Sequence, residues 1–235
     1  MQTARERTAS NVVLEAIRAE SADGSDVNWR TIELERGTVL YSIGDRLRYA
    51  HFPIGCVLAA LSSLSDGSSL EVNVVGREGA TGIMAAIGSG EASGKIVVLV
   101  SGKAVRVPIR WIRAEFARSE RVRNLLTRHV ENLYFQVQQS AVCATRHSVE
   151  ARLARWLLAI QDRALCDSMR FTHEFVAGHL GVNRTSVTLA AAELQRAGLI
   201  TYRRSVLAIA DRQGLENASC ECYGAIRDRI RRLFR

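Results

Sequence analysis

The sequence lacks the features of membrane and secreted proteins. The chain of 235 residues contains no apolar run of about 18 residues, which is what a membrane-spanning helix requires. Its first residues are polar and charged and lead into no apolar segment, so no secretory signal is expected. The expected location is therefore the cytoplasm, without a membrane partner.

Motifs of common enzyme folds are also missing. The chain has no Gly-x-Ser-x-Gly nucleophile turn, no phosphate-binding loop and no His-Glu-x-x-His metal motif. Its glycine-rich region contains few His, Asp or Glu residues that could converge on a reaction. A binding protein is therefore expected rather than an enzyme.

Cysteine is scarce and scattered. Five cysteines stand at positions 56, 143, 166, 220 and 222, and an odd, dispersed set fits reduced thiols better than a disulfide framework. Cys220 and Cys222 form a close pair, but the sequence offers no second pair to complete four metal ligands. We therefore interpret them as packing thiols and expect no metal site.

Positive charge is concentrated in the C-terminal part. The formal net charge is +8; residues 146–235 contain 15 arginines, no lysine and 9 acids, giving +6, and residues 1–145 contribute +2. Such an excess of positive charge is typical of a surface that attracts the phosphate groups of nucleic acids, and we call it the electrostatic footprint. On charge alone, a solvated basic surface fits equally well.

The composition of residues 29–107, with short β-branched runs between glycines, is typical of a small β structure. A polar lead with a short helix around 9–20 precedes them, and 11 of the 17 glycines fall between positions 37 and 102. Strands this short and closely spaced indicate an antiparallel barrel or roll. The predicted strands are VLAAL at 57–61, LEVNVV at 70–75 and KIVVLV at 95–100, with turns at SDGSS and VSGK.

Pro108 ends the strand pattern, and helical periodicity follows. From Val122 onward, apolar residues recur at spacings of three and four and form one stripe, which predicts a long helix over residues 119–145. A long helix between two dissimilar regions is a good site for two chains to pair, and packing against its own β-roll is the alternative. The predicted dimer interface comprises Val122, Leu126, Val130, Leu133, Val137 and Val142.

A helix-turn-helix is predicted at the stretch EFVAGHLGVNRTSVTLAAAEL. Thr172 is a candidate N-cap of the first helix, Gly181 can take the positive φ that ends it, and Asn183 can cap the second. Small Ala177, Gly181 and β-branched Val187 have the spacing that this motif requires. A single long helix that tolerates its glycine, at a cost of about 1 kcal/mol, is the alternative.

The stretch AGLITYRRSVLAIAD predicts a β-hairpin directly after the second helix. Gly198 is a C-cap candidate, Leu199 and Ile200 begin one strand, VLAIA forms the next, and Arg203 and Arg204 lie at the tip. The two helices and the hairpin together indicate a winged helix-turn-helix, which favours DNA binding.

The motif HLGVNRTSVTLAAAELQRAGLI is similar to the Leu-Gly-x-(Ser/Thr)-x-x-(Thr/Ser)-Val…Leu…Gly-Leu-Ile pattern of the Crp/Fnr family of bacterial transcription regulators. The resemblance extends over nearly the whole chain. It implies an α+β fold with three parts: an N-terminal double-stranded β-helix (a jelly-roll-like β-roll) in residues 1–118, a dimerisation helix in 119–145 and a winged helix-turn-helix in 146–235. It also implies a cytoplasmic homodimer that binds a palindromic operator in double-stranded DNA and contacts RNA polymerase.

The exposed side of the predicted second helix carries the candidate base-reading residues. Arg184 can make a bidentate contact to guanine or a contact to phosphate, while hydroxyl groups and Asn183 can serve either phosphates or base edges. Residues of the first helix and the wing are better placed for phosphates. The predicted DNA-binding residues are His173, Asn183, Arg184, Thr185, Ser186, Thr188, Arg203 and Arg204.

The sensor half departs from the cyclic-nucleotide-binding members of this family. In those members an acid binds the ribose hydroxyl and an arginine neutralises the cyclic phosphate. The matching stretch here is GATG, with Ala80 in place of the acid, and Gly94 and Lys95 stand where arginine and serine would fall. A cAMP cofactor is therefore not expected, and the effector is unknown. The candidate effector pocket comprises Gly79, Thr81, Gly82 and Lys95.

Two redox cofactors are alternatives. Family members with an iron–sulfur cluster use N-terminal cysteines, and residues 1–55 contain none. A single haem bound through His51, His129 or His147 is compatible with the sequence, although no motif supports it. The alternative function is thus a small-molecule or redox sensing module whose helix-turn-helix is not its main activity.

Overall fold

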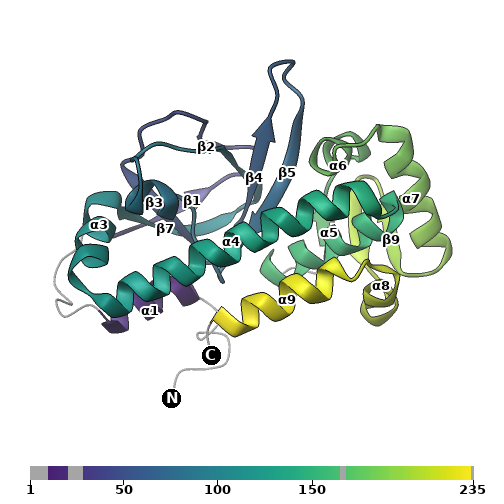
Figure 1. Ribbon diagram of the computed structural model, residues 1–235. Coiled ribbons are helices and arrows are strands. Elements are labelled where there is room, and N and C mark those ends of the chain that lie inside the picture. The colour runs from purple at the N-terminus through teal and green to yellow at the C-terminus, as the bar shows by residue number, and fades with distance from the viewer. Residues whose placement is uncertain (1–9, 21–28, 165–167, 234–235) are drawn as a thin grey trace. The chain divides into compact units, whose positions relative to one another are not determined.

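The computed structural model describes residues 10–20, 29–164 and 168–233, which fall into two compact units (Figure 1). The N-terminal unit consists of Met1–Ala60 and Val75–Leu133, and the C-terminal unit of Leu61–Val74 and Tyr134–Arg235. Residues 61–74 therefore group with the C-terminal unit, whereas the sequence pattern placed them in the sensor part. Cys166 and much of the predicted N-terminal lead lie outside the described residues.

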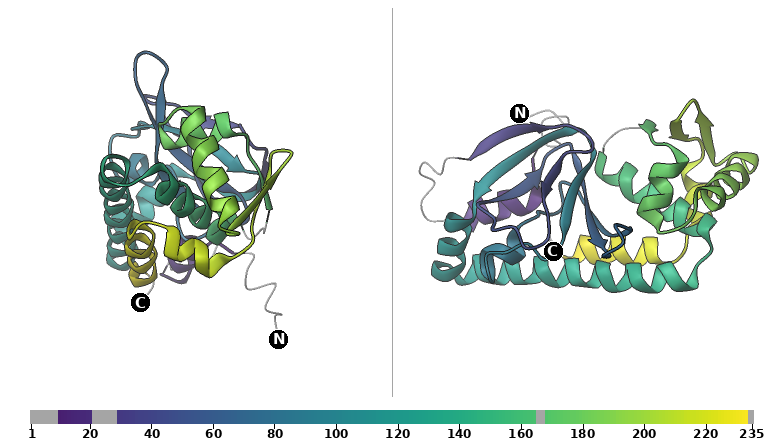
Figure 2. Two further views of the ribbon diagram at one scale, coloured as in Figure 1. Left: turned by 90° about the vertical axis from the view of Figure 1, so that its right-hand side faces the viewer. Right: turned by 90° about the horizontal axis from the view of Figure 1, so that it is seen from above.

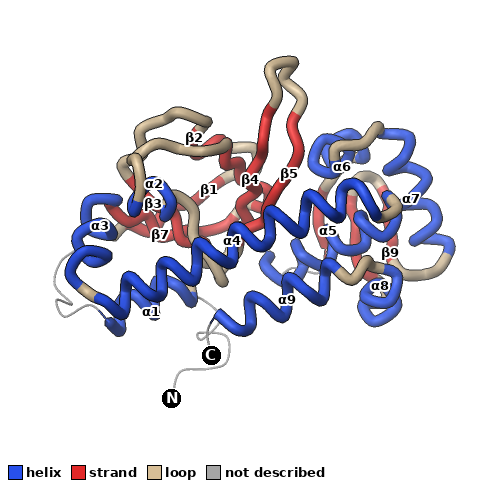
Figure 3. Tube along the Cα trace, viewed as in Figure 1, coloured by secondary structure: helices blue, strands red, loops and turns tan. Residues whose placement is uncertain are grey.

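The segment from Arg30 to Pro108 forms short strands, in keeping with its many β-branched runs and glycines. The strands form two sheets, ordered β1-β7-β3 and β2-β6-β4-β5, with β1 and β3 both antiparallel to β7 (Figure 3). Side chains from both sheets meet in one core that includes Leu34, Leu58, Val98 and Ala104. The predicted β-roll and its three predicted strands are confirmed. The strands are β1 (Arg30–Leu34), β2 (Val39–Tyr41), β3 (Tyr49–Pro53), β4 (Val57–Ser63), β5 (Ser69–Val75), β6 (Lys95–Val100) and β7 (Gly102–Pro108).

Three helices of the N-terminal unit are α1 (Val12–Glu20), α2 (Ile83–Ile87) and α3 (Ile109–Arg118). The side chain of Asn11 caps the start of α1, since its Oδ1 accepts from the Leu14 backbone N–H at 3.0 Å. Helix α3 begins directly after Pro108, which agrees with the predicted end of the strand pattern.

Helix α4 (Glu120–Arg146) is the long helix that the apolar stripe predicts. Among the described residues, no helix has the length and apolar character that crossing a membrane would require. Val122 and Leu126 are fully buried within a single chain. These two assignments to the dimer interface are therefore wrong, because an amphipathic stripe shows that one side of a helix is covered but not by which chain.

Apolar side chains farther along α4 stay accessible. Val130 and Leu133 are half-buried, and three later positions are exposed. Exposed apolar side chains on a helix are typical of a surface that pairs with another chain, and Tyr134 and Val137, three residues apart, form an exposed apolar row on one side of α4. The exposed positions are Tyr134 (64%), Val137 (38%) and Val142 (51%).

The C-terminal unit combines helices with a small sheet, ordered β8-β10-β9. Its largest fully buried side chains include Trp156, Leu157 and Phe171. Strands β9 and β10 confirm the predicted hairpin, while β8 and the last two helices were not predicted. The elements are α5 (Val149–Ala164), β8 (Ser168–Arg170), α6 (His173–Leu180), α7 (Arg184–Arg196), β9 (Ile200–Arg203), β10 (Val206–Ile209), α8 (Arg212–Ala218) and α9 (Cys222–Leu233).

Within the C-terminal unit, the buried carboxylate of Glu71 in β5 contacts side chains of α5 and α6. The Trp156 indole N–H donates to Glu71 Oε1 at 3.0 Å, and His179 Nδ1 lies 2.6 Å from Glu71 Oε2. The side chains of Glu71 and His179 are only 5% and 8% exposed, respectively. Because a buried polar group is costly without a partner, these three side chains depend on one another.

Candidate DNA-binding surface

The cap residues that the sequence predicts delimit two separate helices. Thr172 Oγ1 accepts from the Phe175 backbone N–H at 3.1 Å at the start of α6, and Asn183 Oδ1 accepts from the Ser186 N–H at 2.8 Å at the start of α7. Gly181 ends α6 in the left-handed conformation, with φ of 63°. The alternative of one long helix is therefore wrong.

Glycine is also required at position 181 by its surroundings. A Cβ atom there would lie 2.7 Å from Leu70 Cδ1, in addition to the strain of a positive φ. Ala177 and Val187 are almost completely buried where α6 and α7 pack together. The small residue, the turn and the β-branched residue thus have the packing roles that their spacing predicts.

The first turn of α7 presents an open polar face. Asn183, Arg184, Thr185 and Thr188 are exposed, and Ser186 is half-buried. Such a helix start offers side chains and backbone N–H groups to a groove of DNA or to phosphates. Because Asn183 Oδ1 accepts the capping hydrogen bond, its amide N–H groups are the donors that this side chain can offer to DNA.

His173 lies between the two helices and the wing. Its Nδ1 is 2.9 Å from Thr188 Oγ1, and its ring stacks on Tyr202 with centroids 4.5 Å apart. Burial lowers the pKa of His173, and the positive charge of Arg184 lowers it further. The stacked imidazole is placed to position Thr188, and the phosphate contact expected of His173 stays a prediction.

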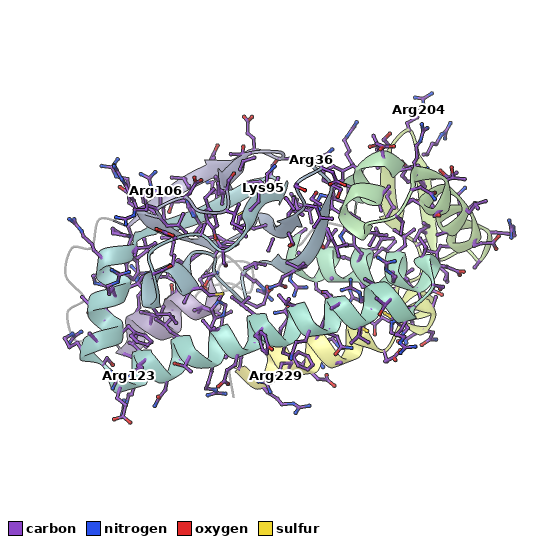
Figure 4. All side chains as sticks on the ribbon, turned by 45° about the horizontal axis from the view of Figure 1, so that its top comes forward. Arg36, Lys95, Arg106, Arg123, Arg204 and Arg229 are labelled. Carbon is purple, nitrogen blue, oxygen red and sulfur yellow. The ribbon has the colours of Figure 1, made fainter. Side chains whose placement is uncertain are left out.

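The tip of the wing is a two-residue hairpin turn. Arg203 pairs with Val206, and the intervening Arg204 and Ser205 have φ angles of 51° and 62°. Positive φ at both central positions is the type I′ turn that matches the twist of a β-hairpin. Arg204 points outward from this tip (Figure 4).

The arginines of the C-terminal unit fall into two groups. Arg212 and Arg227 form ion pairs with acids, such as Arg212 with Asp162 at 2.6 Å. By contrast, the exposed Arg184, Arg203 and Arg204 form no ion pair within the described part of the chain. Their charges remain available to phosphates, as the predicted electrostatic footprint requires.

Three of the predicted effector residues, Gly79, Thr81 and Gly82, lie in a closely packed segment. Ala80 is fully buried, Thr81 is 5% exposed, and Gly82 has a backbone φ of 86° with Ala50 packed against it. A Cβ on Gly79 would lie 3.0 Å from Val75, so this segment is closely packed. Lys95, half-buried at the start of β6, is the only charged side chain among the four candidates.

A hollow of about 520 Å³ lies in the N-terminal unit, lined by residues of β1, β3, β7 and α3 and by the segment before β3. The guanidinium of Arg106 lies 4.2 Å from the centre of the Tyr49 ring there. We call this the basic hollow. No local motif predicts it, because its charged side chains come from separate segments: Arg30, Arg48, Arg106, Arg110 and Arg113.

The sequence analysis also missed a cluster of four side chains of the types that can bind a metal ion. It found no residues to complete four ligands with Cys220 and Cys222, and that expectation is wrong, because Cys143 of α4 and His147, the residue after α4, lie beside them. Three of the four are cysteines that the sequence shows plainly. Their proximity was hidden because 77 residues separate Cys143 from Cys220.

The architecture of α6, α7 and the wing defines a winged helix-turn-helix protein. Residues 151–218 match the family model of the Crp-like helix-turn-helix domain. The match identifies these residues as a Crp-like helix-turn-helix domain, and the chain as a whole shares its fold with solved regulators described as Crp/Fnr or CRP family members. A search of curated protein sequences finds no match.

Several solved structures share the fold. FixK2 from Bradyrhizobium japonicum is 15% identical, with a TM-score of 0.69 over 82% of this chain and 98% of that chain. A CRP-family transcriptional regulator from Thermus thermophilus is 22% identical, with a TM-score of 0.64 over 80% and 96%. The c-di-GMP-responsive regulator CLP from Xanthomonas campestris is 13% identical, with a TM-score of 0.62 over 84% and 97%.

Proposed function

We propose that the chain acts as a homodimer in which two copies of α7 read the two halves of a palindromic operator. The observation that supports this most directly is the open first turn of α7, where Arg184 is exposed and forms no ion pair among the described residues. In proteins of this architecture the start of the second helix contacts base edges, and paired helices reach successive major grooves at a separation of roughly 34 Å. Contact with RNA polymerase would follow from occupancy of such an operator.

A gel-shift experiment tests this function. Genomic fragments are incubated with the purified full-length chain at physiological salt, with non-specific DNA as competitor. We expect sequence-selective retardation, and footprinting of the retarded fragments should show a two-fold symmetric site. Absence of retardation under any ligand condition would instead favour the sensing module whose helix-turn-helix is not its main activity.

Substitution of Val137 by arginine should separate the proposed homodimer. The exposed apolar row on α4 would then carry a charge that cannot be desolvated cheaply at an interface. We expect monomers in sedimentation velocity and weaker binding to a palindromic site. Gln138→Arg, at the adjacent exposed position, is the control and should stay dimeric. An unchanged sedimentation coefficient for Val137→Arg would remove this row from the interface.

We further propose that the effector is an anion and that it binds in the basic hollow. Five arginines line this space, and phosphate or carboxylate groups are the ligands that guanidinium groups bind best. Inorganic phosphate, citrate and AMP can serve as probes in thermal denaturation. At least one should raise the midpoint for the parent chain and for Arg46→Glu, a substitution outside the hollow, but not for Arg48→Glu. Equal shifts in all three proteins, or none in the parent, would count against the site.

A further inference from the structure

Four metal-binding side chains converge in the C-terminal unit. Cys143 and His147 belong to α4 and the residue that follows it, while Cys220 and Cys222 lie at the junction of α8 and α9. Their ligand atoms all lie within 4.8 Å of one another, the three cysteines are buried and the histidine is half-buried. Helix α9 runs beside the C-terminal half of α4 (Figure 2), and the Arg229 guanidinium lies 5.6 Å from the centre of the Phe135 ring.

Local structure explains why the four side chains meet. Cys143 and His147 are four residues apart at the end of a helix and therefore project from the same face. The Tyr223 backbone N–H donates to the Cys220 carbonyl at 3.0 Å, which makes the Cys-x-Cys segment a tight turn at the start of α9. One helical face and one turn thus contribute two ligands each.

The distances fit a single tetrahedral ion. Zinc–sulfur bonds of about 2.3 Å and zinc–nitrogen bonds of about 2.0 Å place two sulfurs about 3.8 Å apart, and a sulfur and a nitrogen about 3.6 Å apart. Here Cys143 Sγ lies 3.5 Å from Cys220 Sγ, and Cys222 Sγ lies 3.6 Å from His147 Nδ1. A disulfide would need two sulfurs about 2.0 Å apart, and a cluster of several irons would spread its ligands more widely.

The groups around the four ligands suit a metal as well. His147 Nε2 lies 3.1 Å from the Glu221 carboxylate, which leaves Nδ1 directed at the cysteines. A carboxylate behind a metal-bound imidazole fixes the ring and raises its basicity. Gln139 donates to Cys222 Sγ at 3.1 Å.

We propose that Cys143, His147, Cys220 and Cys222 bind one zinc ion in a closed tetrahedral site that fastens the start of α9 to the end of α4. Three thiolates and one imidazole form a ligand set that prefers zinc to the harder divalent cations. With four protein ligands no position is left for a substrate, so the site is structural.

Metal analysis of the full-length chain tests the proposal. Protein purified under reducing conditions without chelator should contain about one zinc ion per chain. Cys143→Ser, Cys222→Ser and His147→Gln should each reduce this content at least tenfold, on the order expected from loss of a ligand. Cys56→Ala, which removes a buried cysteine of the N-terminal unit, is the control and should keep its zinc.

Two measurements on folded protein distinguish loss of a zinc ligand from loss of zinc through unfolding of the variant. Cobalt added to the metal-free parent chain should give the visible absorption bands of tetrahedral thiolate coordination. Glu221→Ala removes a side chain that is 79% exposed and should weaken zinc binding about 10- to 100-fold, whereas Asp228→Ala, within α9, should not. Absence of zinc before and after reconstitution, or mass spectra that show a Cys143–Cys220 disulfide in the parent chain under the same reducing conditions, would overturn the proposal.

Discussion

Replacement of Glu71 by alanine is expected to lower the free energy of unfolding by about 2 to 4 kcal/mol. The substitution removes the acceptor of both the Trp156 indole and His179, and each buried donor left without a partner costs about 1 to 3 kcal/mol. Urea denaturation followed by tryptophan fluorescence measures the loss. Nearly the whole Glu71 side chain is inaccessible, so water cannot replace the carboxylate without a rearrangement.

Two further variants make this measurement specific. Glu71→Gln keeps an acceptor for one donor and should lose less stability than Glu71→Ala. Glu35→Ala removes an exposed acid of the N-terminal unit and should stay within about 0.5 kcal/mol of the parent. Equal stability of Glu71→Ala and Glu35→Ala would mean that the buried network contributes nothing.

Replacement of Arg184 by alanine should cost about 1 to 3 kcal/mol of discrimination between the operator and competing sequences, or about 5- to 150-fold. The side chain opens α7, is exposed and has no ion pair in the described part of the chain. Competition binding with single-base variants of the operator measures the effect. Arg184→Lys separates two roles, because lysine keeps the charge for a phosphate but cannot make a bidentate contact to guanine.

A matched control lies at the other end of the same helix. Arg196 is exposed in the last turn of α7 and pairs with Glu193 at 2.6 Å. Arg196→Ala should therefore leave sequence discrimination unchanged. If Arg184→Ala binds every competitor as the parent does, Arg184 does not read bases.

Local signals in the sequence predicted the DNA-binding half well. Thr172, Gly181 and Asn183 act within three or four residues of their own positions, so caps and turns can be recognised without knowledge of the tertiary structure. The wing was predictable for the same reason, because alternating apolar residues flank two arginines at its tip. The contacts that these residues make with DNA remain predictions.

Long-range contacts were not predictable in the same way. Periodicity correctly gave α4 its length, but it assigned Val122 and Leu126 to a partner although their own chain buries them. The cysteine cluster joins segments 77 residues apart, and the basic hollow collects arginines from several segments. In each case the property arises only when distant segments meet, and no pattern within one segment reports it.

The position of Glu71 in the chain has a consequence for biosynthesis. Its partners Trp156 and His179 follow 85 and 108 residues later, so the core of the C-terminal unit cannot close while the ribosome is still adding the N-terminal unit. Contacts between residues so far apart in the sequence slow folding, because the intervening chain must first close into a loop, which costs entropy, before the contact can stabilise the fold. A fragment that starts at Tyr134 would leave the indole and imidazole donors without their carboxylate, and excision of this DNA-binding half should yield a less stable molecule than its compact outline implies.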